Sequence, residues 1–217
     1  MPWTDAWFGF PAFHPAANAL TFSEHLLGVS VIAAPLSWLS GNDVVAYNVT
    51  LLLGYVLSGL AMFALVLRLT GSKAAAFVSG AAFAFVPYRA AQVSHIQVGV
   101  VFWAPLALLG LHAFIETGRR RWLALFGLCW MLQGAANGYF LVFFSVLVGL
   151  WILWFVVARG RWRDLASITA TLAVAALPLA PILARFSMAH AHYGLSRPPE
   201  EIASFGADIA GVLCASS

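Results

Sequence analysis

Charged residues are scarce in this chain. Only 9% of its 217 residues are Asp, Glu, Lys or Arg, whereas 62% are hydrophobic. A soluble globular domain carries about a quarter charged residues. The composition therefore excludes an ordinary soluble domain. It predicts an all-α, polytopic integral membrane protein whose principal partner is the lipid bilayer, and we expect no nucleic-acid partner.

Cysteines are scarce as well, and their positions exclude further classes. Cys129 lies within an apolar run and Cys214 lies near the end of the chain, so the two cannot form a disulfide framework. The sequence has no zinc-ligand spacing and no Gly-rich phosphate loop after a strand pattern. It also has no basic segment leading into an apolar core at its start, which excludes a signal peptide.

Long apolar runs are what the sequence has instead, and a membrane-spanning helix needs about twenty such residues. We expect about six spans, of which the second and fourth are short: residues 45–67, 74–88, 98–115, 122–136, 139–158 and 165–184.

A further apolar run at 26–39 is too short for an ordinary span, and Pro35 interrupts it. It predicts an interfacial or re-entrant helix with Ser23 as its N-cap. The chain then divides into an exterior loop with a juxtamembrane helix (1–44), a transmembrane domain (45–185) and an exterior tail (186–217).

The charges indicate how the spans are oriented. Eight of the eleven Lys and Arg residues lie in alternate connections: Arg68, Lys73, Arg119, Arg120, Arg121, Arg159, Arg161 and Arg163. The positive-inside rule places these connections in the cytoplasm. The other face receives six of the eight acidic residues and five of the six histidines. Polar chemistry is therefore expected at the outer face of the membrane.

This orientation makes residues 45–67 run from outside to inside, so that residues 1–44 begin outside. A tail of that length is awkward to export without a preceding span. We expect a helix upstream of Met1, and hence that the chain is a fragment of a longer protein. The alternative is that 26–39 spans the membrane.

Several short segments carry a resemblance to a known class of membrane enzyme. They are Phe22–Gly28, Gly41-Asn42, Tyr47-Asn48, Leu69–Ser72, Phe83–Arg89, Ser94–Gln97, Trp103–Leu106, Gln133 and Gly138-Tyr139. On these segments the chain resembles bacterial GT-C type integral-membrane glycosyltransferases. More closely, it resembles a set of multi-spanning bacterial proteins near that superfamily. The resemblance covers most of residues 5–210.

The resemblance implies the bacterial cytoplasmic (inner) membrane and a polyprenyl-phosphate-linked sugar donor. It also implies a first helix, followed by a large exterior loop that carries an acidic catalytic residue. Residues 1–44 match the distal part of such a loop. The first helix and its acid would then lie upstream of Met1, and a further C-terminal part would follow the chain.

Glu24 and Asp5 are the candidate catalytic carboxylates of residues 1–44. Sugar transfer needs a carboxylate to deprotonate or polarise the nucleophile that attacks the anomeric carbon. Glu24 is also a candidate ligand for a divalent cation, although the sequence leaves the metal and cofactor unknown. The alternative role of Glu24 is structural, as a carboxylate favouring a helix N-terminus.

The stretch from Pro87 to Gln97 joins two apolar runs on the expected outer face. Arg89, His95 and Gln97 are candidate substrate-binding residues here, because the planar fork of an arginine meets phosphate oxygens bidentately. The alternative is an arginine that anchors at the lipid headgroups.

His25, Gln133 and Tyr139 are further candidates for substrate binding at the same outer face. For the last two, the alternative is a tight helical hairpin built on Asn137-Gly138. The histidines of the tail, His190 and His192, are interpreted as part of a solvated loop.

A transporter or lipid-handling protein without covalent chemistry is the competing function. Transporters commonly show repeats with broken helices near the middle of the membrane. The sequence has no internal repeat, and its ionisable residues gather at the outer interface, which favours chemistry on a lipid-linked substrate.

Overall fold

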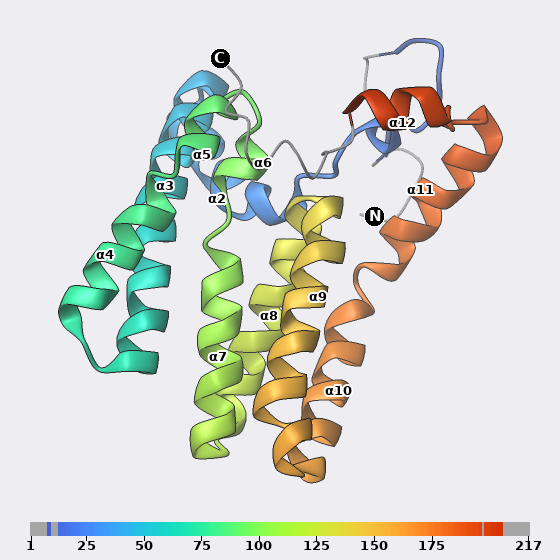
Figure 1. Ribbon diagram of the computed structural model, residues 1–217. Coiled ribbons are helices and arrows are strands. Elements are labelled where there is room, and N and C mark those ends of the chain that lie inside the picture. The colour runs from blue at the N-terminus through green and yellow to red at the C-terminus, as the bar shows by residue number, and fades with distance from the viewer. Residues whose placement is uncertain (1–7, 10–12, 197, 206–217) are drawn as a thin grey trace.

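The computed structural model describes residues 8–9, 13–196 and 198–205, and every regular element among them is a helix (Figure 1). This confirms the all-helical expectation. The helices are η1 Ala19–Phe22, α2 Leu27–Ser40, α3 Asp43–Thr70, α4 Lys73–Ala84, α5 Pro87–Ala91, α6 Ile96–Gly99, α7 Trp103–Thr117, α8 Arg120–Ala136, α9 Gly138–Phe155, η2 Val157–Arg159, α10 Trp162–Ala176, α11 Ala180–Tyr193 and α12 Pro199–Phe205.

Within the described part of the chain, four helical stretches are long and apolar enough to cross a membrane: Asp43–Thr70, Lys73–Ala91, Ile96–Thr117 and Gly138–Arg159. The pair α10 and α11 adds a fifth if the two helices are taken as one span bent by 55°. Helix α8 has 17 residues, which at 1.5 Å per residue is about 25 Å, less than the ~30 Å of a hydrocarbon core. The expected six spans are therefore not confirmed, and the structure supports about four.

Side chains at the connections explain why the helices begin where they do. The Asn42 carboxamide oxygen accepts hydrogen bonds from the first backbone N–H groups of α3, and the Ser72 hydroxyl accepts one from Ala75 in α4. The expected N-cap at Ser23 is wrong. Ser23 lies in extended backbone after η1, and α2 begins at Leu27, after Leu26 in the left-handed region at φ 54°.

Helix α7 lies at the centre of the bundle, where it packs against α3 and α8. The approach to α8 is close because position 110 is glycine: a Cβ there would lie 2.8 Å from the Phe126 nitrogen. The apolar core around α7 includes Leu111 of α7, Phe126 of α8 and Val148 of α9.

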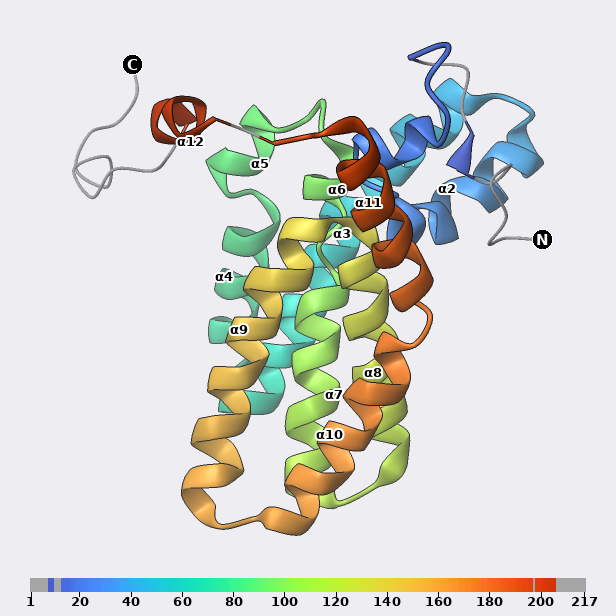
Figure 2. The ribbon, with the colours of Figure 1, turned by 90° about the vertical axis from the view of Figure 1, so that its right-hand side faces the viewer.

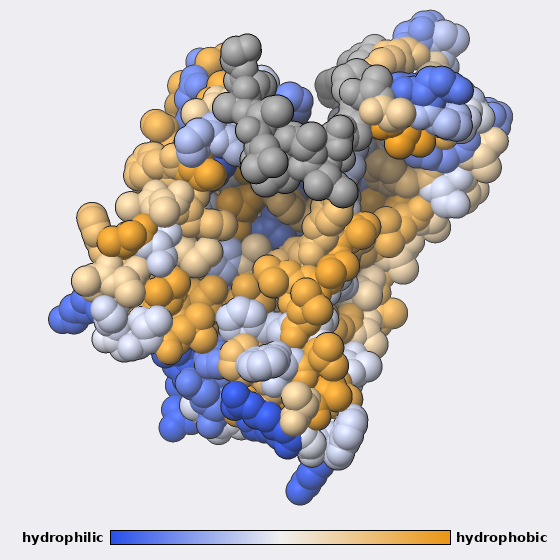
Figure 3. Space-filling view, in the orientation of Figure 1, coloured by the Kyte–Doolittle hydropathy of each residue, from blue (hydrophilic) through white to orange (hydrophobic). Residues whose placement is uncertain are grey.

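The two ends differ in chemistry. The three connections that carry the basic residues all lie at the lower end of Figure 1, whereas η1, α2, α5 and α6 lie at the upper end. Figure 3 shows hydrophilic residues gathered at the lower end, below a broad band of hydrophobic ones. We call the lower end the basic end and, after the orientation that the sequence predicts, the upper end the outer end.

Pro178 lies in the break between α10 and α11, and Pro181 lies in the first turn of α11. Proline lacks the N–H that continues a helix and clashes with the preceding turn, so the chain bends by 55° here. Helix α11 then leans away from the bundle toward the outer end (Figures 1 and 2). It continues to Tyr193, whereas the sequence predicted that the helix ends at residue 184.

Candidate functional site

The stretch from Pro87 to Gln97 folds as two short helices, and its arginine points inward. Arg89 is only 4% exposed, and its guanidinium carbon lies 4.4 Å from the centroid of the Tyr55 ring. The guanidinium donates hydrogen bonds to four backbone carbonyls, those of Gly54, Phe83, Ala84 and Gly99.

Three of these carbonyls belong to the last turns of helices, Phe83 and Ala84 in α4 and Gly99 in α6. The last carbonyls of a helix have no partner within it, and they carry partial negative charge. Arg89 therefore binds two helix C-termini together and ties both to α3. Both interpretations of the sequence placed this arginine at a polar surface, and the structure instead buries it.

Within the same stretch, Gln97 contacts another of the predicted site residues. The Gln97 amide donates to the Glu24 carboxylate over 3.3 Å, and the Ser23 hydroxyl donates to the same oxygen over 3.3 Å. His95 is exposed, with its Nδ1 3.2 Å from the Ser94 hydroxyl. The structure thus brings Glu24 and Gln97 together across 73 positions of the sequence.

Gln133 is fully buried, and its side chain contacts the start of α7. Its side-chain oxygen accepts a hydrogen bond from the backbone N–H of Ala104 over 3.0 Å. The first N–H groups of a helix have no partner within that helix, so this contact stabilises the entry into α7. The sequence made Gln133 a candidate for substrate binding at the outer face, with a tight helical hairpin as the alternative. The structure places its side chain within the helix packing.

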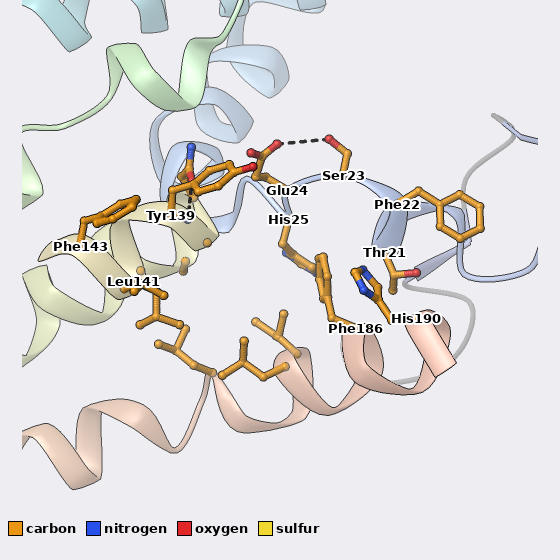
Figure 4. Close-up of a pocket in the computed structure, with 18 residues that line it drawn as sticks. Thr21, Phe22, Ser23, Glu24, His25, Tyr139, Leu141, Phe143, Phe186 and His190 are labelled. Carbon is orange, nitrogen blue, oxygen red and sulfur yellow. Dashed lines mark hydrogen bonds between the residues drawn. The ribbon is translucent and has the colours of Figure 1, made fainter. Parts of the chain in front are cut away.

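A cavity of about 680 Å³ opens at the outer end, between the segment that precedes α2, the α8–α9 turn and α11 (Figure 4). We call it the outer pocket. It is lined by Thr21, Phe22, Ser23, Glu24, His25, Gly134, Ala135, Asn137, Gly138, Tyr139, Leu141, Val142, Phe143, Leu179, Ile182, Leu183, Phe186 and His190. Three predicted site residues, Glu24, His25 and Tyr139, are among them.

Polar and apolar side chains line different parts of the outer pocket. Glu24 and Tyr139 lie at one rim of the outer pocket in Figure 4, and His190 and Phe186 rise from α11 on the opposite side. The rest of the wall contributed by α9 and α11 is aliphatic or aromatic. His25 is half-buried, and burial lowers the pKa of its imidazole below the ordinary value. Burial therefore favours the neutral form of the imidazole.

His190 is the lining residue that the sequence interpretation missed. The sequence predicts a solvated loop here, but α11 extends to Tyr193 and places His190 in the outer pocket. A signal was present in the sequence. Leu179, Ile182, Leu183, Phe186 and His190 recur at the spacing of one helical face, so the apolar face could have been followed past residue 184.

Two contacts hold α11 against the segment that forms the pocket's rim. The Tyr193 hydroxyl donates to the Ala17 carbonyl over 3.1 Å, and the Tyr193 ring meets Phe22 edge-on with centroids 5.1 Å apart. At the α8–α9 turn, the Asn137 side chain accepts a hydrogen bond from the Tyr139 N–H over 2.7 Å. The Asn-Gly hairpin that was an alternative in the sequence is thus present, and it also forms part of the pocket.

The described residues do not supply a metal site. Among them, no group of three or more His, Cys, Asp and Glu side chains is placed to hold an ion, although Glu24, His25 and His190 line one cavity. Asp5, the other predicted carboxylate, lies outside the described residues.

A scan against protein-family models and searches of curated proteins and of solved structures gave no match to this chain. Its class rests on fold and site alone. The chain is an all-helical protein with several apolar helices compatible with a membrane. At one end it has a cavity that joins a carboxylate and two imidazoles to an apolar wall.

Proposed function

We propose that the outer pocket binds the polar end of a lipid-linked substrate, with the lipid chain against α9 and α11. The observation that supports this is the divided lining, in which Glu24, His25 and His190 share one cavity with an apolar wall. Ligand pockets are mostly apolar, with a few polar groups that orient the ligand. An amphipathic molecule at a membrane surface matches this lining, because it has a polar end for the polar residues and an apolar chain for the apolar wall.

The reaction proposed for this site is transfer of a sugar from a polyprenyl-phosphate-linked donor to an acceptor hydroxyl on the outer face. The acceptor oxygen attacks the anomeric carbon and loses its proton to Glu24. The bond from that carbon to the phosphate oxygen breaks, and polyprenyl phosphate leaves with the electron pair. Glu24 is held for this role by the hydrogen bonds from Ser23 and Gln97.

The groups proposed to face the leaving phosphate are His190 and Tyr139, because both line the pocket and both carry hydrogen-bond donors. Arg89, the earlier candidate, is occupied by backbone carbonyls in this structure. The resemblance to GT-C enzymes noted in the sequence is what suggests the sugar and the polyprenyl phosphate. The pocket itself argues only for an amphipathic ligand.

The same proposal includes the topology. The chain is proposed to cross the bacterial inner membrane six times, with α8 as a short span and α10–α11 as a broken span. The basic end would face the cytoplasm by the positive-inside rule, and the outer pocket would then face outward. Its apolar wall would lie within the outer leaflet.

Binding is tested with the full chain in nanodiscs and a short-chain polyprenyl-phosphate sugar as the probe. His190→Ala should weaken binding by about tenfold, the magnitude of one lost hydrogen bond to a charged group. His192→Ala is the matched control, because this histidine lies on the same helix outside the pocket lining. Equal small losses in both variants would refute the assignment of the pocket.

Chemistry is tested separately by single-turnover sugar transfer. Glu24→Gln should keep binding within about twofold but slow transfer by about 10²–10⁴-fold, the usual contribution of general base catalysis. Glu200→Gln, an exposed carboxylate on α12, is the control. Transfer at the wild-type rate by Glu24→Gln would remove Glu24 from the mechanism while leaving the binding proposal standing.

A second candidate is lipid handling without covalent chemistry. The break between α10 and α11, with its 55° bend, is the observation that favours it, since broken helices are common in transporters. This candidate predicts binding that depends on His190 together with no measurable transfer by wild-type protein.

A further inference from the structure

The basic end carries a second cavity that the proposed function does not use. It has a volume of about 580 Å³ and lies between the α7–α8 connection and the start of α10. Arg120, Arg161 and Arg163 line it, together with a single carboxylate, that of Asp164. Three guanidinium groups against one carboxylate leave an excess of two positive charges. We call this cavity the basic pocket.

The arginines of the basic pocket are not equivalent. Arg161 is already paired, with both Nε and Nη2 lying 2.6 Å from an Asp164 oxygen. The side chains of Arg120 and Arg163 are exposed, and neither guanidinium has a hydrogen bond or ion pair with any residue that the structure describes. Two cationic forks therefore remain available for an anion.

Helix direction adds to this charge. Helices α8 and α10 both begin at the basic pocket, at Arg120 and Trp162. The N-terminus of a helix carries partial positive charge and unpaired N–H groups, which favour anions. The charge and the helix ends thus point to the same kind of ligand, one that contains a phosphate.

An apolar groove continues from the basic pocket. It has a volume of about 570 Å³, runs between α8 and α10, and shares Arg120 and Leu123 with the basic pocket. Small side chains on both helices, such as Ala124 and Ala170, leave the space. We call it the α8–α10 groove, and Figure 2 shows the two helices beside one another along its length.

The groove has the length of a lipid chain in one leaflet. From Arg120 to Met131 it follows eleven steps of α8, or about 16 Å at the rise of a helix. Half of a ~30 Å hydrocarbon core is about the same depth. Trp162 lies at the rim and is 62% exposed, as is usual for tryptophan at headgroup level.

From this continuity we propose that the basic pocket and the α8–α10 groove together bind one anionic phospholipid of the leaflet at the basic end. The phosphate lies between Arg120 and Arg163, and one acyl chain lies in the groove. This site is independent of the outer pocket and of any reaction there. Basic pockets between membrane helices are a recurrent way to bind anionic headgroups.

The test measures lipid binding to the full chain in detergent by native mass spectrometry. The probes are phosphatidylglycerol, phosphatidylcholine with the same acyl chains, and inorganic phosphate. Wild-type protein should bind phosphatidylglycerol about tenfold or more tightly than phosphatidylcholine, because two cationic side chains meet the anionic headgroup. Inorganic phosphate should bind far more weakly, since it makes no contact with the groove.

Two variants separate the parts of the site. The double variant Arg120→Gln, Arg163→Gln should lose the preference for phosphatidylglycerol while binding phosphatidylcholine as before, which also shows that it is folded. Ala170→Phe fills the groove and should weaken both lipids alike without changing the preference.

The control removes the same charge from the same end, outside the basic pocket. Lys73→Gln with Arg119→Gln should change the preference by less than about twofold. An equal loss in this control would mean general attraction of lipids to a basic surface and would overturn the proposal. Phosphate binding as tight as that of phosphatidylglycerol, or no preference in wild-type protein, would overturn it as well.

Discussion

Replacing Arg89 tests whether this residue holds the outer end together or binds a ligand. Its guanidinium donates to four backbone carbonyls and is 4% exposed. A hydrogen bond from a charged donor contributes about 1.5–3 kcal/mol, and contributions within one network do not simply add. Counting two of the four bonds at the lower value predicts that Arg89→Ala lowers the free energy of unfolding by about 3 kcal/mol.

The Lys variant refines this expectation. Arg89→Lys should recover only part of the loss. The planar guanidinium of arginine can donate to the ends of two helices at once, whereas the compact ammonium group of lysine cannot. The same chemistry predicts where the damage falls. The carbonyls of Phe83 and Ala84 at the end of α4, and that of Gly99 at the end of α6, would lose a donor, so α4–α6 should loosen before the central helices do.

The measurement is equilibrium unfolding in mixed micelles, followed by far-UV circular dichroism. Arg119→Ala is the control: it removes an exposed arginine at the basic end and should change stability by less than about 0.5 kcal/mol. Our reasoning would be refuted if Arg89→Ala unfolded like wild-type protein and instead lost affinity for a polyprenyl phosphate. That result would return Arg89 to the ligand-binding role first predicted from the sequence.

Three further predictions follow from the packing, the pocket and the proposed topology. Gly28→Ala should destabilise by about 2 kcal/mol, because its Cβ would clash with the backbone oxygen of Leu132 in α8. Gly149→Ala is the control and should not destabilise, because beyond its own local backbone a Cβ there would meet no atom of the described residues within 4 Å. Equal losses would contradict the close packing of α2 on α8. Burial lowers the pKa of His25, so as the pH falls the imidazole takes up a proton in the unfolded chain before it does in the folded one. The free energy of unfolding should therefore fall as the pH drops below about 6.5. His25→Gln should flatten that dependence, and a free energy of unfolding that rises toward acid pH would contradict the prediction. In a background without other cysteines, an impermeant thiol reagent added outside cells should label Ser94→Cys and not Lys73→Cys, and the reverse pattern would invert the topology.

Much of the helical framework follows from the sequence alone. Apolar runs bounded by Asn42, Ser72 and Asn137 begin helices because these side chains accept the first free N–H groups. The spacing of the basic clusters predicted that three connections share one face, and they lie together at the basic end. These features depend on neighbours along the chain, so a linear pattern contains them.

The site depended on contacts that no linear pattern specifies. Arg89 looked like a surface residue because it follows a proline in a polar stretch, yet the short helix α5 turns its side chain toward carbonyls of three other helices. His190 entered the outer pocket because α11 continues past residue 184 and leans against η1. The tertiary structure decided both positions, since the direction of a side chain is set by the path of its helix and by the groups packed around it.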